Sequence, residues 1–188
     1  MKKEVRWNPS KCVTSVLLEL AKKPLTPIQL RTKTGMIKNN YANIILKKLE
    51  RDGTIACLTP GNIIGKIFCI DPSKSRLVEN ALKKKGFKQK VMPLPDVNWE
   101  VYGRLICPYC SKLRAVLAKA NELRMANREI SVFNLMEKLP AMAKGDVYRA
   151  LNKLEGFRII EYITDRPKRY SITREGFLLM KFDHGILI

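Results

Sequence analysis

The sequence predicts a mostly helical protein with small β-hairpins, in which one order of helices and hairpin occurs twice. Two observations carry this prediction. Residues 42–70 have the pattern of an amphipathic helix followed by two short apolar strands, and the same pattern returns about 100 residues later. The chain of 188 residues is long enough for two such domains, each with a modest hydrophobic core.

The first copy of the pattern begins with a helix whose apolar residues are spaced i, i+3, i+4 and i+7, namely Ala42, Ile45, Leu46 and Leu49. Gly53 then allows the left-handed conformation in which helices often end. The apolar segments 54–58 and 66–70 flank the turn-rich residues 59–62, which predicts a hairpin. With a short helix before it, this order is the winged helix-turn-helix pattern.

The second copy keeps a constant register with the first. Residues 46–50, LKKLE, are matched by residues 151–155, LNKLE, at an offset of 105. After the hairpin turn the offset falls to 102, so the second turn is three residues shorter. Other matched positions are Thr26 and Ser131, Ile55 and Ile160, and Ile70 and Ile172. Because helix caps, core positions and hairpins agree, we expect two tandem winged helix-turn-helix domains.

The remaining elements of the first domain follow from caps and prolines. Ser10 is expected to cap a helix that ends before Pro24, and Thr26 with Pro27 opens a second helix to residue 34. Asp71 with Pro72 opens a trailing helix, whose expected buried face is Leu77, Val78, Ala81 and Leu82. The first domain is therefore residues 1–86, and residues 87–98, around two prolines, form a linker.

The second domain is expected over residues 99–188. Residues 99–106 are compatible with helix or strand, and residues 111–123 with a helix. Ser131 is expected to cap a helix over 132–139, and the next helix spans 144–155. The second hairpin is expected to pair residues 158–163 with 169–172, and Thr173 to cap a final helix.

The charge balance favours a polyanionic partner. The chain holds 36 Lys and Arg against 17 Asp and Glu, a net charge of +19, which favours nucleic acid over a membrane surface. Lysine-rich surfaces of thermophilic proteins are the alternative explanation. No apolar run of about 18 residues and no signal peptide is apparent, so we expect a cytoplasmic protein. No catalytic triad, carboxylate pair or phosphate-binding loop is apparent either, so we do not expect an enzyme.

The stretches LKKLERDGTIACLTPGNIIGKIFCI and VYRALNKLEGFRIIEYITDRPKRYSIT resemble archaeal-type tandem winged-helix transcriptional regulators, which belong to the MarR/ArsR-like superfamily. The resemblance covers the whole chain. It implies that the third helix of each domain enters the major groove and that the wing lies along the phosphates. In the second domain Arg158 occupies the position of the usual glycine, with Gly156 nearby.

The residue types on these elements suit DNA. Asparagine can bond bidentately to adenine and arginine to guanine, as expected of Asn39, Asn40 and Asn43 in one domain and of Arg149 in the other. Basic residues at the hairpin turns suit phosphate. The full candidate set is Lys38, Asn39, Asn40, Asn43, Lys47 and Lys66 in the first domain, and Lys144, Tyr148, Arg149, Asn152, Lys153, Arg166, Lys168 and Arg169 in the second. The alternative is that these residues only cover solvated helix faces.

The cysteines give one motif, Cys107-Pro108-Tyr109-Cys110, which resembles the glutaredoxin active-site tetrapeptide. A thiol at a helix N-terminus can have a lowered pKa. The Val-Pro loop and Gly-Gly turn of glutaredoxins are missing, and a zinc site would lack its second cysteine pair, His184 being the one histidine. We therefore expect no cofactor and no metal, with Cys107 and Cys110 as the only metal candidates.

The sequence as a whole predicts a sequence-specific regulator of transcription that binds double-stranded DNA. The alternatives are a replication-initiator or chromosome-architecture protein, a protein-interaction winged-helix module, and a thiol redox protein. The apolar C-terminal residues, which are Phe177, Leu178, Met180, Phe182 and 186–188, also suggest a homodimer through the final helix. Packing of that helix on its own domain is the competing hypothesis.

Overall fold

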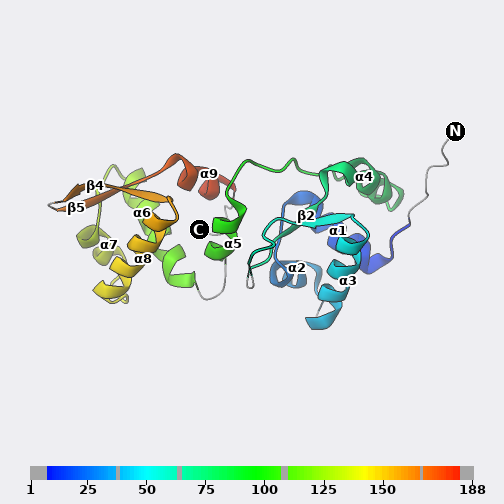
Figure 1. The fold of residues 1–188 in the computed structure, drawn as a ribbon, viewed down its shortest axis with the longest axis horizontal. Helices are drawn as coiled ribbons and strands as arrows, with labels where there is room; N and C mark the ends of the chain where they lie inside the picture. Colours follow the sequence, from blue (N-terminus) through cyan, green and yellow to red (C-terminus); the bar gives the residue numbers. More distant parts are fainter. Residues whose placement is uncertain (1–7, 37–38, 63–64, 107–109, 166, 183–188) are drawn as a thin grey trace. The chain divides into compact units, whose positions relative to one another are not determined.

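The computed structural model describes residues 8–36, 39–62, 65–106, 110–165 and 167–182, without the side chains of Asn39 and Asn40. The described residues are mostly helical and form small antiparallel sheets, as the sequence predicts (Figure 1). The chain divides into two compact units, residues 1–94 and 95–188.

The described residues of the first unit form three helices, a two-stranded sheet and a further helix. In order these are α1 (Lys11–Lys22), α2 (Pro27–Thr34), α3 (Asn39–Arg51), β1 (Ile55–Cys57), β2 (Phe68–Ile70), the 3₁₀ turn η1 (Pro72–Lys74) and α4 (Ser75–Lys84). β1 and β2 are antiparallel, with Ile55 opposite Ile70. An antiparallel bridge between Leu25 and Phe68 joins the segment before α2 to β2.

The first two helices of this unit begin where the caps predict, whereas Asp71 caps the 3₁₀ turn η1 and α4 begins only at Ser75. The Ser10 hydroxyl accepts a hydrogen bond from the amide of Val13 at 3.5 Å. Thr26 and Gln29 form a reciprocal capping box, in which the Gln29 amide donates to the Thr26 hydroxyl and the Gln29 side chain accepts from the Thr26 amide. Gly35 ends α2 in the left-handed conformation, with φ of 67°.

The core of the first unit lies where α1, α2, α3 and α4 meet the sheet. Val16, Leu17, Leu30 and Val78 are completely buried within it. The prediction for α4 was wrong at Leu77, which is 37% exposed. Val78, Ala81 and Leu82, spaced i, i+3 and i+4, already fill the narrow stripe that faces α1, and Leu77 lies one step around the helix.

The second unit adds a leading helix and a third strand to this plan. Its elements are α5 (Trp99–Ile106), α6 (Ser111–Met125), β3 (Ile130–Ser131), α7 (Val132–Lys138), α8 (Lys144–Gly156), β4 (Ile160–Asp165), β5 (Lys168–Ile172) and α9 (Arg174–Phe182). The sheet order is β3-β5-β4, all antiparallel. Residues 99–106, ambiguous in the sequence, are helical.

The expected strand limits of the second hairpin were shifted. β4 begins at Ile160 rather than at Arg158, because Arg158 has a φ of 57° and forms the left-handed turn after α8. The corresponding residue after α3 is Gly53, with φ of 65°. A left-handed conformation costs a non-glycine residue roughly 1 kcal/mol or more, so the second unit accommodates strain that the first avoids.

The bounds of the two units follow the offset present in the sequence. α3 spans 39–51 and α8 spans 144–156, which is 105 residues later. Ile160 pairs with Ile172 as Ile55 pairs with Ile70. The pairing of Ile130 with Tyr170 corresponds to the bridge between Leu25 and Phe68.

The C-terminal helix α9 packs within its own unit. Thr173 caps it by accepting a hydrogen bond from the Gly176 amide at 3.1 Å. Leu179 and Met180 are buried, and the Phe182 ring lies edge-on to Trp99 of α5, with 5.1 Å between the ring centroids. Leu178 is 41% exposed, and residues 186–188 lie outside the described part of the chain. Phe177 is 36% exposed, so α9 buries Leu179 and Met180 within its own unit and leaves Phe177 and Leu178 accessible.

The close packing of α9 predicts a strong effect of Gly176→Ala. A Cβ at Gly176 would lie 2.3 Å from the Ile159 carbonyl oxygen and 2.9 Å from Ile172, so backbone must move. We expect a loss of about 2 kcal/mol in the free energy of unfolding, measured by urea denaturation. Gly156→Ala is the control, since nothing lies within 4 Å of its added Cβ and alanine suits a helix. Equal stability of the two variants would contradict this packing.

Candidate nucleic-acid interface

The exposed face of α3 is mixed in character. Asn43 and Lys47 are exposed, as expected, while Ile45 and Leu46 are buried beneath them. Ile44, between these groups, is 60% exposed, and Tyr41 is 48% exposed. The face therefore presents an amide and an ammonium group beside two large apolar side chains.

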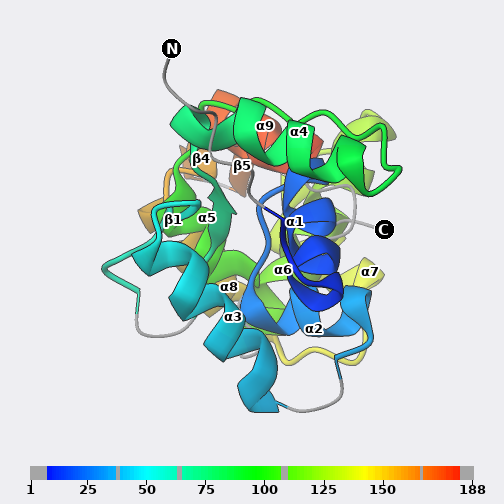
Figure 2. The ribbon, with the colours of Figure 1, turned by 90° about the vertical axis from the view of Figure 1, so that its right-hand side faces the viewer.

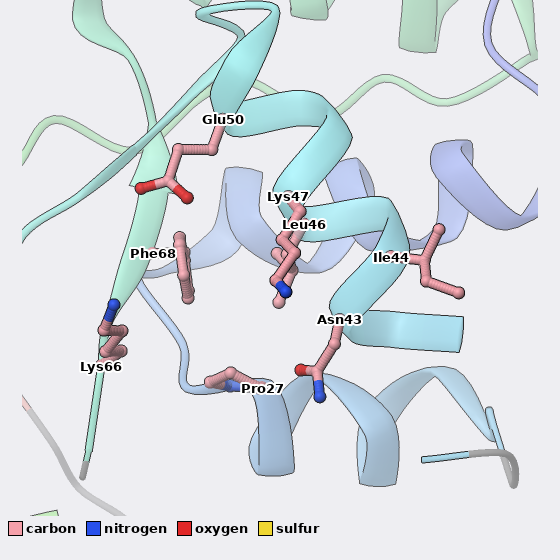
Figure 3. A pocket seen from close by; sticks show the side chains of 8 residues that line it. All are labelled: Pro27, Asn43, Ile44, Leu46, Lys47, Glu50, Lys66 and Phe68. Carbon is pink, nitrogen blue, oxygen red and sulfur yellow. The ribbon is translucent and has the colours of Figure 1, made fainter. Parts of the chain in front are cut away.

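A hollow of about 410 Å³ separates this face from the hairpin (Figure 3). Its polar lining comes from Asn43, Lys47 and Glu50 on α3 and from Lys66, which precedes β2. Phe68 and Pro27 are among its apolar residues. Lys66 is thus placed across the hollow from α3, as the hairpin prediction requires, but Glu50 adds a negative charge that would oppose a phosphate inside the hollow.

The exposed face of α8 is more strongly cationic. Lys144, Arg149, Asn152 and Lys153 are all exposed, and Tyr148 is partly buried. The opposite face packs into the core through Val147, Ala150, Leu151 and Leu154. The predicted candidate residues of this helix therefore share one accessible surface.

Asp146 organises two cations at the start of α8. Its carboxylate accepts hydrogen bonds from Lys112 of α6, at 2.5 Å, and from Arg149, at 2.6 Å. The hydrogen bond from Lys112, followed by that from Arg149, lowers the pKa of Asp146 below its usual value. The Arg149 side chain is nevertheless 76% exposed, so most of its donors remain accessible. Asp146 was not among the residues singled out in the sequence.

In the second hairpin Lys168 is exposed, whereas Arg169 is held in an ion pair. The Lys168 ammonium lies 5.9 Å from the centre of the Tyr162 ring, whose hydroxyl donates a hydrogen bond to Asp165. Arg169 forms an ion pair of 2.8 Å with Glu129, the residue before β3. Arg169 was expected on phosphate beside Lys168, whereas the structure pairs it within the sheet. The two-residue strand β3, which brings Glu129 there, is too short to give a signal in the sequence.

Other expected residues lie outside the described part of the chain. These are Lys38, the side chains of Asn39 and Asn40, Arg166 and Cys107.

The faces of α3 and α8 differ at two equivalent positions. At an offset of 105, Ile44 corresponds to Arg149 and Tyr41 corresponds to Asp146. The second helix thus carries an ion pair where the first carries two exposed apolar side chains. The two helices cannot make the same contacts with a ligand.

The described thiols form no metal site. Cys110 lies at the N-cap position of α6, and no three His, Cys, Asp or Glu residues in the described ranges could hold a metal ion. Cys57 and Cys69 are on neighbouring strands without a disulfide. Burial raises the pKa of the Cys69 thiol to about 11.

Comparison with protein-family models, with curated proteins and with solved structures finds no match to this chain. Within the described ranges, no helix has both the length and the apolar character needed to cross a membrane.

The environment of Cys69 predicts an unreactive thiol. With a pKa of about 11, the thiolate is a small fraction at pH 8, and the side chain is 2% exposed. We expect iodoacetamide at pH 8 to leave Cys69 unmodified in the folded protein and to modify it in urea, as read by peptide mass spectrometry. Labelling of Cys69 in the folded protein at the rate of the unfolded chain would contradict its burial.

Proposed function

We propose that this chain is a sequence-specific regulator of transcription, built from two winged helix-turn-helix domains that bind double-stranded DNA. The observation that carries the proposal is the exposed cationic face of α8, where Lys144, Arg149, Asn152 and Lys153 stand on the second long helix of a helix–turn–helix followed by a hairpin. A helix in this position can enter the major groove, and arginine and asparagine are suited to read purine edges there.

The net charge and the repeated plan support this proposal. A charge of +19 gives a long-range attraction to a polyanion. α3 and α8 occupy equivalent places in two units, which gives one chain two candidate recognition helices.

The two helices are assigned different tasks in this proposal. α8 reads bases through Arg149, and Asp146 fixes the guanidinium from one side while its other donors stay exposed. α3 uses Asn43 for adenine and the exposed Ile44 for the methyl group of thymine. Lys66 and Lys168, near the two hairpin turns, contact phosphates without reading sequence.

Assembly and the other functional classes follow from the same surfaces. A homodimer would use the exposed Leu178 and the residues that follow α9, although Leu179 and Met180 are already buried.

A chromosome-architecture role would need the same DNA contacts without base reading. A protein-interaction role would use the apolar side chains around the hollow beside α3. This role would leave the cationic face of α8 unexplained.

The decisive test is binding to DNA as a function of salt. We expect the full chain to bind a random 30-base-pair duplex, with log K falling linearly against log salt because each neutralised phosphate releases counterions, at a slope of roughly −0.9 per contact. Fluorescence anisotropy from about 50 to 200 mM salt measures this slope. Binding that is absent, or that does not depend on salt, would contradict a DNA-binding function.

In the second unit, the reading of bases by α8 can be separated from the contact of the hairpin with phosphates. After a preferred site is selected from a random pool, Arg149→Ala should weaken that site by about 1–3 kcal/mol and random DNA much less. Lys168→Ala should weaken both equally and lower the salt slope by roughly one. Arg174→Ala, an exposed arginine at the start of α9, is the control for loss of charge. If Arg149→Ala weakens both duplexes equally, α8 does not read bases.

A further inference from the structure

A second basic surface lies away from α3 in the first unit. Residues 83–90, at the end of α4 and just beyond it, read KKKGFKQK, and we call them the lysine strap. They contain five lysines and no acidic residue, and the sequence has none from 80 to 95. All five lysines are exposed, namely Lys83, Lys84, Lys85, Lys88 and Lys90. No ion pair joins any of them to a described residue.

The helix dipole accounts for only part of this cluster. Cations are favoured in the last turn of a helix, which covers Lys83 and Lys84, and the effect declines beyond that turn. Lys88 and Lys90 follow Gly86, whose φ of 87° ends the helix. Lys88 and Lys90 therefore lie beyond the turn in which the helix dipole favours cations.

The backbone of the strap is held against the first unit. The amide of Phe87 donates to the Leu82 carbonyl at 3.0 Å, which closes the end of α4. Just after the strap, the amide of Val91 donates to the Glu79 carboxylate at 2.9 Å and that of Met92 to the Ala21 carbonyl at 2.8 Å. The lysines are thus carried on a backbone that is tied at both ends, and a ligand need not order it first.

The strap and α3 belong to different sides of the unit. α4 packs on α1, and Figures 1 and 2 both show α4 above the core of this unit, with α2 and the start of α3 below it. A duplex seated on the exposed face of α3 would leave the end of α4 directed away from it. This separation favours a different stretch of DNA for the strap from the one seated on α3.

We propose that the lysine strap binds the phosphates of a second segment of double-stranded DNA, so that one chain bridges two duplexes. This inference rests on the proposed function, because the first duplex is the one seated on α3. Lysine is a flexible point charge that suits phosphate without reading bases, and the strap has no side chain suited to a base edge apart from Gln89. A lipid surface is disfavoured because Phe87 is the one apolar side chain of the strap, which offers no apolar face to insert.

The test compares two variants that lose the same charge. The strap variant replaces Lys85, Lys88 and Lys90 by glutamine. The control variant makes the same replacement at Lys11, Lys138 and Lys181, which are exposed lysines of α1, α7 and α9 and form no ion pair with a described residue. Because both sets of lysines are on the surface, we expect wild type and the two variants to have the same secondary structure by circular dichroism and the same stability in urea. One biotinylated duplex is then immobilised, and the capture of a second, fluorescent duplex by each protein is measured at about 50 mM salt.

Wild type and the control variant are expected to capture the second duplex, and the strap variant about tenfold less, with a salt slope for capture lower by roughly 2–3. Binding of all three proteins to the first duplex should remain within about twofold of one another. Equal capture by the strap and control variants would overturn the bridging inference and leave the proposed function intact. Failure of wild type to bind even the first duplex would overturn both. A strap-dependent attachment to phosphatidylserine vesicles, with DNA capture unchanged, would assign the strap to membranes and overturn the inference.

Discussion

The antiparallel pairing of the segment before the second helix with the second hairpin strand organises each unit. Leu25 and Phe68 exchange two backbone hydrogen bonds of 3.0 Å each, and both side chains are buried. The equivalent pairing joins Ile130 to Tyr170. Because the helix after this segment packs on the helix that precedes the hairpin, the pairing closes a ring of contacts. The helix and the hairpin of each unit are therefore connected through the same core.

Much of this plan is local and could be predicted from the sequence. Caps such as Thr26 act on amides three residues away, and buried stripes repeat within a single helix, so neither needs knowledge of the fold. The constant offset between the two copies related the helix over 144–155 to the helix of the first copy, although the expected strand 158–163 began two residues before β4. Gly53 marked the end of α3 for the same reason, since its left-handed φ is a property of one residue.

What the sequence missed depends on contacts between distant residues. Glu129 reaches Arg169 across forty positions only because β3 joins the sheet, and β3 is two residues long. Lys112 meets Asp146 in the same way, through the packing of α6 on α8. Arg158 adopts a conformation that its residue type disfavours, and its carbonyl accepts a hydrogen bond from Thr173 that helps to hold it there. Each of these features changes which cations remain available to a ligand.

The distribution of charge in the first unit argues for two surfaces rather than one. Residues 1–94 hold 20 basic and 6 acidic side chains, which is a larger excess than in the second unit. Yet the face of α3 carries Tyr41 and Ile44 where α8 carries Asp146 and Arg149, and Glu50 lines the adjoining hollow. The lysine strap supplies five of the 20 basic side chains of this unit and no acidic one. If DNA contact explains the charge of this unit, the face of α3 accounts for only part of it, and the lysine strap is the proposed second site of contact.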